Sequence, residues 1–255
     1  MSAGRPGRWL LLRGLGREQR HWGAFGTTLA DRLGVEVVAL DLPGAGTQSG
    51  GASPASIAGI VDDLRRRWLE LPERSGEAWG VLSVSLGGMV TLDWASRFSS
   101  DFAAAVVVNS SVANLSPPWR RMRPAALASI ARAVLARDDA ERERLVLSVT
   151  TSHCDDPDAV ASEWALYRQQ RPMSLRSFGA QLVAASGFRA PASVPVPLLV
   201  VNSAGDRLCD PSCSEAIARR YHAPLVTHAT AGHDLGNDAG PWLAGVVSDW
   251  LERSP

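Results

Sequence analysis

Lysine is absent from the chain, so all 26 basic side chains are arginine, and they balance 26 acidic ones. Without lysine there is no Schiff-base chemistry, no lysine-anchored cofactor and no phosphate-binding loop of the Walker type. The zero net charge gives no bulk electrostatic reason to bind nucleic acid or an anionic membrane. We therefore predict neither a nucleic-acid partner nor a membrane partner.

Cysteine and long apolar runs are also scarce. The cysteines Cys154, Cys209 and Cys213 are too few, and odd in number, for a disulfide framework. Cys209 and Cys213 are four residues apart, but no further His or Cys pair completes a metal set, so no metal is expected. The apolar run at residues 9–12 is too short for a signal-peptide core, and no stretch approaches the roughly 20 apolar residues of a membrane span. We expect a soluble, cytoplasmic protein.

Short apolar runs alternate with helical patterns along most of the chain. The runs are rich in Val and Leu without polar alternation, as parallel strands covered on both faces require. Apolar residues at helical spacing follow, at 57–71 and again at Trp242, Val246 and Trp250. The pattern predicts an α/β fold, with a mostly parallel central sheet flanked by helices. The expected strands are residues 9–12, 35–40, 81–84, 103–108, 198–201 and 225–227.

One long segment breaks this alternation. Residues 112–189 contain helical stretches rich in Ala, Arg and Leu, punctuated by proline, and no convincing strand. We predict that residues 112–189 form a helical cap inserted between two strands, and that residues 1–111 and 190–255 form the α/β core. Extra helices packed into the core are the alternative interpretation.

The stretch VLSVSLGGMV, residues 81–90, contains two serines that could serve as a nucleophile. A catalytic serine between a strand and a helix lies in a tight turn, which demands small residues two positions before and after it. For Ser85 these positions hold Ser83 and Gly87, which are small, whereas Ser83 has the β-branched Val81 before it. Ser85 is therefore the candidate nucleophile.

A serine hydroxyl needs a general base, and the base needs an acid that orients it. His233 lies in a loop after the last expected strand and can reach the edge of the sheet where Ser85 must be. Its rival, His228, is still at the end of that strand. Asp206 follows the preceding strand, whereas the alternative acid, Asp210, precedes a proline and is better explained as a helix N-cap. The predicted catalytic residues are Ser85, Asp206 and His233.

With these residues placed, the chain resembles the α/β-hydrolase family over nearly its full length, through SVSLGG, LDLPGAG, the Asp206 loop and AGH. Its size and helical insertion are similar to those of small carboxylesterases, such as the pimeloyl-carrier methyl ester esterases. The resemblance implies a serine hydrolase that cleaves a carboxylic ester or thioester through an acyl-enzyme on Ser85, without a cofactor. It also implies an oxyanion hole formed by the backbone N–H groups of Leu86 and Leu15.

The chain departs from the family pattern where the usual His-Gly pair reads Arg13-Gly14. One hypothesis is that Arg13 or Arg17 receives a substrate carboxylate, because a guanidinium offers a planar fork of donors. The alternative is a solvated loop in which Arg13 makes structural hydrogen bonds. Aromatic residues of the expected cap are candidates for an acyl pocket or for cap-to-core packing: Trp119, Trp164, Phe178 and Phe188.

Other readings of the same residues stay open. Arg120, Arg121 and Arg123 could meet an acidic acyl carrier protein, or they could form a solvated charge cluster. A protein with this fold could also bind a small molecule with slow turnover or none. The same triad could serve C–C bond hydrolysis, amide cleavage or acyl transfer.

Overall fold

The computed structural model describes residues 5–72 and 78–253, and its centre is one six-stranded sheet. The strand order is β2-β1-β3-β4-β5-β6, and every neighbouring pair is parallel. This confirms the predicted α/β fold, and each expected strand is found within two residues of its predicted bounds. The strands are β1 Arg8–Leu12, β2 Glu36–Leu40, β3 Trp79–Val84, β4 Ala104–Val108, β5 Leu198–Ser203 and β6 Leu225–His228.

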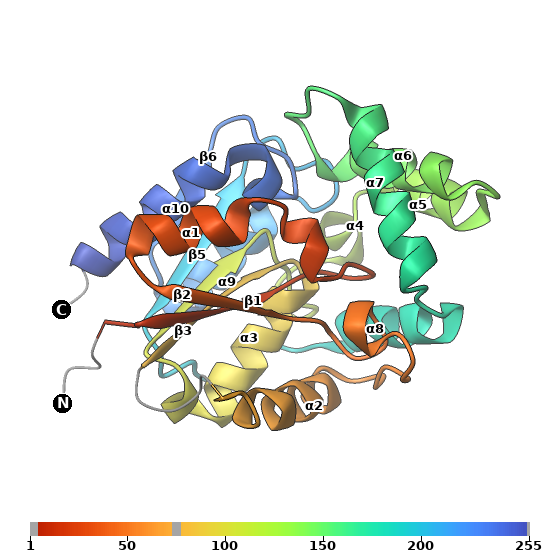
Figure 1. Cartoon of the computed structure of the whole chain (residues 1–255). Helices are drawn as coiled ribbons and strands as arrows, with labels where there is room; N and C mark the ends of the chain where they lie inside the picture. The colour runs from red at the N-terminus through yellow and green to blue at the C-terminus, as the bar shows by residue number, and fades with distance from the viewer. Residues whose placement is uncertain (1–4, 73–77, 254–255) are drawn as a thin grey trace.

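Helices cover both faces of the sheet and one end of it (Figure 1). Three short 3-10 helices among the described residues are η1 Gln19–Trp22, η2 Gly46–Gln48 and η4 Ser99–Asp101. The α-helices are α1 Phe25–Leu33, α2 Ile57–Leu69, α3 Leu86–Arg97, α4 Pro118–Arg121, α5 Pro124–Leu135, α6 Asp139–Thr150, α7 Pro157–Gln170, α8 Leu175–Gly187, α9 Ser212–Tyr221 and α10 Leu235–Arg253. In the described part of the chain, no helix is both long and apolar enough to span a bilayer.

The core has two halves, one on each face of the sheet, because successive strand residues point to opposite faces. In β1, Leu10 and Leu12 belong to the cluster under α2, α3 and α9, whereas Trp9 and Leu11 belong to the cluster under α1 and α10. All four side chains are at most 1% exposed. Burial on both faces explains why this strand is apolar at every position rather than at alternate ones.

The apolar face predicted for α2 is buried as expected, whereas the face predicted for α10 is buried only in part. In α2 the expected stripe is buried from Ile57 to Trp68. In α10 the backbone kinks at Ala239, and the buried stripe of its second part runs through Leu243, Val247 and Trp250. Trp242 and Val246 are only half-buried, so the buried stripe is displaced by one residue at these two positions, whereas the predicted Trp250 is buried. The displaced stripe packs against α1, which the sequence alone does not position.

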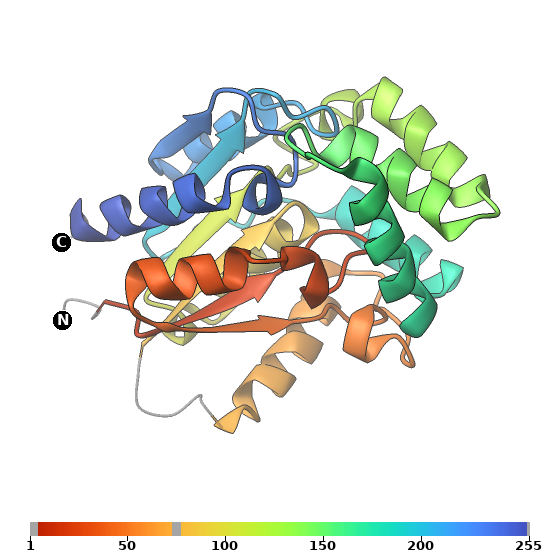
Figure 2. The same cartoon turned by 45° about the horizontal axis from the view of Figure 1, so that its top comes forward.

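The helices α4 to α8 lie between β4 and β5 in the chain and gather at the end of the molecule opposite both termini (Figures 1 and 2). Polar contacts attach them to the core: the Gln181 amide in α8 accepts from the Gly16 N–H and donates to the Pro43 carbonyl. Their position agrees with a cap, although the boundaries at 112 and 189 stay a prediction. Residues 1–4, 73–77 and 254–255 of the expected core lie outside the described residues.

Candidate active site

Ser85 occupies a strained turn between a strand and a helix. β3 ends at Val84 and α3 begins at Leu86, so the turn is a single residue, and Ser85 adopts φ 58° and ψ −118°. A non-glycine residue at positive φ costs free energy, and such strain concentrates at functional sites. At Gly87 an added Cβ would lie 2.6 Å from the Leu12 carbonyl oxygen, so the position two after the serine has no room for a side chain.

The competing serine has structural partners instead. The Ser83 side chain is fully buried in β3. Its hydroxyl donates to the Val106 carbonyl at 3.3 Å and accepts from the Thr91 hydroxyl at 2.8 Å. These bonds join the strand to α3 and β4, which leaves Ser85 as the serine placed in the turn.

The structure brings His233 and Asp206 together from two loops at the same edge of the sheet. The Asp206 Oδ2 atom lies 2.7 Å from His233 Nδ1, and both residues are buried. Asp206 Oδ1 accepts from the N–H groups of Leu208 and Cys209 at 2.8 and 2.9 Å, which fixes the carboxylate. The remaining ring nitrogen, His233 Nε2, is buried and has no hydrogen-bond partner among the described residues. This arrangement leaves one ring nitrogen free to exchange a proton.

The two rival residues are occupied elsewhere. His228 Nδ1 accepts from the N–H groups of Thr230 and Ala231, which shapes the turn after β6. Asp210 accepts from the Ser212 N–H at 3.0 Å, at the start of α9, and pairs with Arg123 at 3.2 Å. Both roles are those of residues that stabilise loops and helix ends.

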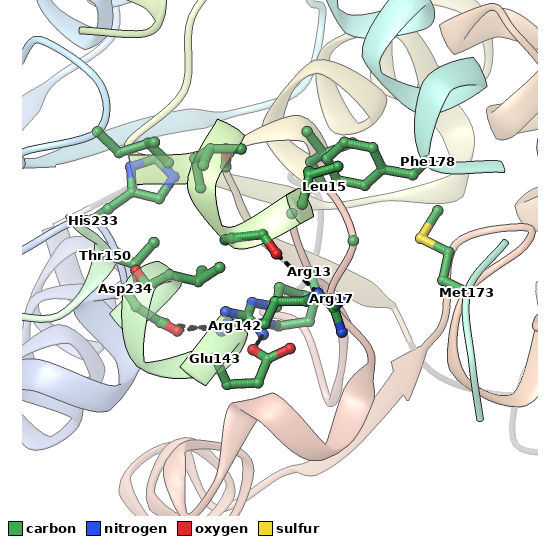
Figure 3. Close-up of a pocket in the computed structure, with 18 of the residues that line it drawn as sticks. Arg13, Leu15, Arg17, Arg142, Glu143, Thr150, Met173, Phe178, His233 and Asp234 are labelled. Atoms are coloured by element: carbon green, nitrogen blue, oxygen red, sulfur yellow. Dashed lines mark hydrogen bonds and ion pairs between the residues drawn. The ribbon is translucent and has the colours of Figure 1, made fainter. Parts of the chain in front are cut away.

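A cavity of about 380 Å³ contains Ser85 and His233 in its wall (Figure 3). Figure 3 shows His233 on one side of this cavity, Leu15, Phe178 and Met173 on the opposite side, and a group of arginines and carboxylates below. The cavity extends between α5, α6 and α8, so most of its wall comes from the expected cap. Its larger apolar side chains are Leu15, Val84, Met122, Ile130, Val134, Val146, Met173, Leu175, Phe178 and Leu208.

The backbone donors expected for an oxyanion lie beside the serine. Leu86 is the first residue of α3, where an N–H has no partner within the helix. Leu15 lines the cavity next to Gly14, and a Cβ added to Gly14 would lie 3.0 Å from the Ser85 Cβ atom. Within residues 5–72 and 78–253, neither Leu15 nor Leu86 donates its N–H to another protein group.

The contacts of Arg13 do not fit the hypothesis that it receives a substrate carboxylate. Its guanidinium donates two hydrogen bonds, at 2.9 and 2.6 Å, to Asp234, the residue after His233. Both side chains are about 5% exposed or less, and the guanidinium also lies over the Trp22 ring, 4.7 Å from its centroid. The fork of Arg13 is therefore occupied by a carboxylate of the protein itself. This corrects the substrate-binding hypothesis for Arg13 in favour of the structural alternative, although the loop is buried rather than solvated.

Burial and the charges of the neighbouring arginines together determine the pKa of Asp234 and of His21. Burial raises the pKa of Asp234, but the charge and hydrogen bonds of Arg13, with a hydrogen bond from Asn237, outweigh it and hold this pKa below the ordinary 3.8. Burial, together with the charges of Arg17 and Arg13, lowers the pKa of His21 well below 6.5. His21 is therefore neutral at pH 7, and its Nε2 atom lies 3.2 Å from Arg17 Nη1.

Two buried polar residues that support the site escape sequence reasoning. Asn109 follows β4 at φ 46°, and its amide donates to the backbone carbonyl of His233 at 2.9 Å. Asp41 follows β2 and accepts from the N–H groups of Gln19 and Thr47 at 2.6 and 2.7 Å. Each is a polar residue directly after an apolar strand, and that position is the signal that could have identified them.

The cap residues named from the sequence separate into three groups. Phe178 lines the cavity, Trp164 and Phe188 are buried outside its wall, and Trp119 is 65% exposed and also lies outside it. Arg121 donates to carbonyls at the end of α8, and Arg123 pairs with Asp210. In the described chain, no group of three or more His, Cys, Asp or Glu side chains is arranged as a metal site.

A parallel sheet with a strained serine after its third strand, and an aspartate–histidine pair after its last two, defines an α/β protein with a nucleophile-type turn. A model of the "Alpha/beta hydrolase family" matches residues 9–245. The chain therefore belongs to this family, and hydrolase is the class of enzyme that the match supports. Comparison with proteins of curated function found no match.

Solved structures agree on the fold. A hydrolase from Pseudomonas aeruginosa PA01 is 20% identical, with 98% of this chain and 92% of that one covered at a TM-score of 0.75. A thermophilic esterase from Thermogutta terrifontis is 18% identical, with 98% and 91% covered at 0.68. A meta-cleavage product hydrolase from Pseudomonas fluorescens IP01 is 15% identical, with 99% and 93% covered at 0.71. At these identities the likeness concerns the fold alone.

Proposed function

We propose that this protein is a serine hydrolase that cleaves a carboxylic ester or thioester through an acyl-enzyme on Ser85. The observation that carries the proposal is the pairing of His233 with Asp206 through one ring nitrogen only. The other nitrogen is buried and unpartnered, and the same cavity holds the strained Ser85. An imidazole held in this way is prepared to accept a proton from a serine hydroxyl.

The reaction follows the roles of these groups. Ser85 Oγ attacks the carbonyl carbon while its proton passes to His233 Nε2, and Asp206 stabilises the imidazolium that forms. The N–H groups of Leu86 and Leu15 bind the tetrahedral oxyanion, where hydrogen bonds strengthen as charge develops. Collapse breaks the bond to the alcohol or thiol, which leaves with the proton from His233. Water then attacks the acyl-enzyme by the same route and releases the carboxylic acid.

The cavity wall favours an apolar acyl chain. Side chains of α5 and α8, Ile130, Val134, Leu175 and Phe178, line the space on the cap side. Leu175 is 72% exposed, so this apolar wall continues to the protein surface. Burying a methylene group contributes about 0.8 kcal/mol, so each added carbon that fits should improve kcat/KM by up to about fourfold.

Labelling with a fluorophosphonate, followed by peptide mapping, tests the proposal on the intact chain. We expect stoichiometric label on Ser85, no label in Ser85→Ala, and full label in the matched control Ser83→Ala. Wild type should also turn over short activated esters steadily. Label on Ser83, or no label and no turnover, would contradict the proposal and favour a binding protein on this fold.

A further inference from the structure

One end of the cavity holds more arginine than carboxylate. Arg13 and Arg17 each have a buried carboxylate of their own, Asp234 and Glu143. Arg142 and Arg168 also line the cavity, and both approach the same carboxylate, that of Asp139. The cavity therefore has one guanidinium without its own counter-charge.

Arg168 in α7 is that guanidinium. Arg142 makes the closer contact with Asp139 and also donates to the carbonyls of Ala133 and Ala136 at 3.0 and 2.6 Å. Arg168 approaches Asp139 only through Nε at 3.3 Å, and Asp139 is its only carboxylate partner in the part of the chain that is described. Its side chain is 32% exposed, and burial and the charge of Arg142 lower its pKa against the opposing charges of Glu143 and Asp139. A partly desolvated cation without a full partner costs free energy, which an anionic ligand would recover.

Arg17 also lines the cavity, and two contacts hold its guanidinium in place. Glu143 holds its Nη1 atom at 2.6 Å, and the Trp164 ring lies against the guanidinium, 4.5 Å from Cζ to the ring centroid. These contacts fix its orientation. The Nη2 atom is nevertheless buried and has no hydrogen-bond partner among the described residues. Because Glu143 compensates the charge of Arg17, Arg168 is the cation of this wall that is available to a ligand.

The positive charge continues beyond the cavity. A second, smaller pocket shares Arg17, Glu143, Arg168 and Met173 with it and adds Arg171. Arg171 has no ion-pair partner within residues 5–72 and 78–253. The apolar wall near Ser85 therefore leads to a region where Arg168 shares its carboxylate partner with Arg142 and Arg171 has no such partner among the described residues.

We propose that this end of the cavity binds a carboxylate at the far end of the acyl chain, so that the substrate is a monoester or monothioester of a dicarboxylic acid. The carboxylate accepts hydrogen bonds from the fork of Arg168, and the apolar chain between its two ends contacts Leu15 and Phe178. Planar guanidinium groups suit a carboxylate because they can donate two parallel hydrogen bonds. This inference rests on the proposed function for the position of the ester, but not for binding of the acid.

The test compares monoethyl esters of dicarboxylic acids with four to nine carbons against ethyl esters of unsubstituted fatty acids of equal length. We expect wild type to prefer the acid-bearing ester at least tenfold in kcat/KM at one chain length. Arg168→Gln should reduce this ratio at least tenfold. The matched control is Arg176→Gln, which changes an exposed arginine of α8 that lies outside both cavity walls and should leave the ratio unchanged.

A binding measurement separates this inference from the proposed function. In Ser85→Ala, calorimetry should find tighter binding of the preferred monoethyl ester than of its uncharged counterpart, and Arg168→Gln in that background should remove the difference. Equal binding of both esters, or a ratio that Arg168→Gln leaves intact, would overturn the inference. If wild type labels at Ser85 and hydrolyses neutral esters without an acid preference, the inference fails alone. If no ester is hydrolysed while the binding difference holds, only the proposed function fails.

Discussion

Replacing Arg13 by methionine keeps most of the side-chain volume but removes the cation that faces Asp234. The pair is buried, and two hydrogen bonds of 2.6 and 2.9 Å join it. Removing one partner of a buried ion pair leaves an uncompensated charge and typically costs about 3–5 kcal/mol. Loss of the contact with the Trp22 ring adds roughly 1 kcal/mol. We therefore expect Arg13→Met to lose about 4–6 kcal/mol of unfolding free energy at pH 8.

The pH dependence of this loss identifies its cause. In wild type the pKa of Asp234 lies below 3.8, because Arg13 outweighs the effect of burial. Its stabilising contribution is therefore fully present above pH 3.8 and is lost as the pH falls through the folded-state pKa. In Arg13→Met the large effect of burial is opposed only by Asn237 and by the charge of Arg17, so the pKa should rise above its ordinary value. The sign then reverses, and the variant should become less stable as the pH increases from 5 to 8, by at most about 1.4 kcal/mol per pH unit.

Urea unfolding followed by tryptophan fluorescence, at pH 5 and at pH 8, measures both effects. The double variant Arg13→Met/Asp234→Asn carries no buried charge at this place, so it should be more stable at pH 8 than Arg13→Met and should lose the pH dependence. With the single variant Asp234→Asn these proteins form a double-mutant cycle. A coupling energy between the two positions below about 1 kcal/mol, or the same pH dependence in Arg13→Met and in the double variant, would refute the argument that Arg13 and Asp234 form a stabilising buried ion pair.

Three further substitutions test the turn and the acid. Gly87→Ala should lower kcat more than tenfold and stability by about 1–3 kcal/mol, because the new Cβ would lie 2.6 Å from a carbonyl of β1; unchanged kinetics would contradict the tight turn. Asp206→Asn should lower kcat by about three to four powers of ten with the fold retained, as judged by circular dichroism. Its control, Asp210→Asn, should change kcat less than about threefold and cost at most about 1 kcal/mol of stability by urea unfolding, because asparagine can also accept from the Ser212 N–H and the lost ion pair with Arg123 is partly exposed. Ser83→Ala should cost about 1–2 kcal/mol through the lost buried hydrogen bonds, with esterase activity retained.

The strands were predictable because a parallel strand buried on both faces must be apolar at every position. The prediction began β3 too late, at residue 81, because Trp79 and Gly80 do not resemble a strand. Gly80 belongs there since an added Cβ would lie 2.6 Å from the Trp9 ring. The prediction ended β5 too early because Asn202 and Ser203 are polar, although both are fully or almost fully buried. Tertiary packing decided these ends, and local sequence does not contain it.

The candidate site divides in the same way. Ser85 was predictable because the constraint on its turn is local, acting on residues two positions away. His233 and Asp206 follow from the strands that precede them, since the carboxyl ends of parallel strands share one edge of the sheet. The partner of Arg13 was not predictable, because Asp234 is 221 residues away and the sequence offers many other carboxylates. The exposure of Trp119 depends in turn on how the cap helices pack.

The arginine in place of the family's histidine is explained by what the loop after β1 must connect. Arg13 and Arg17 leave this loop in two directions, one to Asp234 beside the proposed base and the other to Glu143 in α6. The Asp234 N–H donates to the Thr150 carbonyl at the end of α6, so the base loop and α6 are also joined directly. Leu15, the proposed oxyanion donor, lies between the two arginines in the sequence, so an ion pair fixes the loop on each side of it. Arg13 is engaged with Asp234, so we assign the proposed recognition of an anionic substrate to Arg168, whose own carboxylate partner is shared with Arg142.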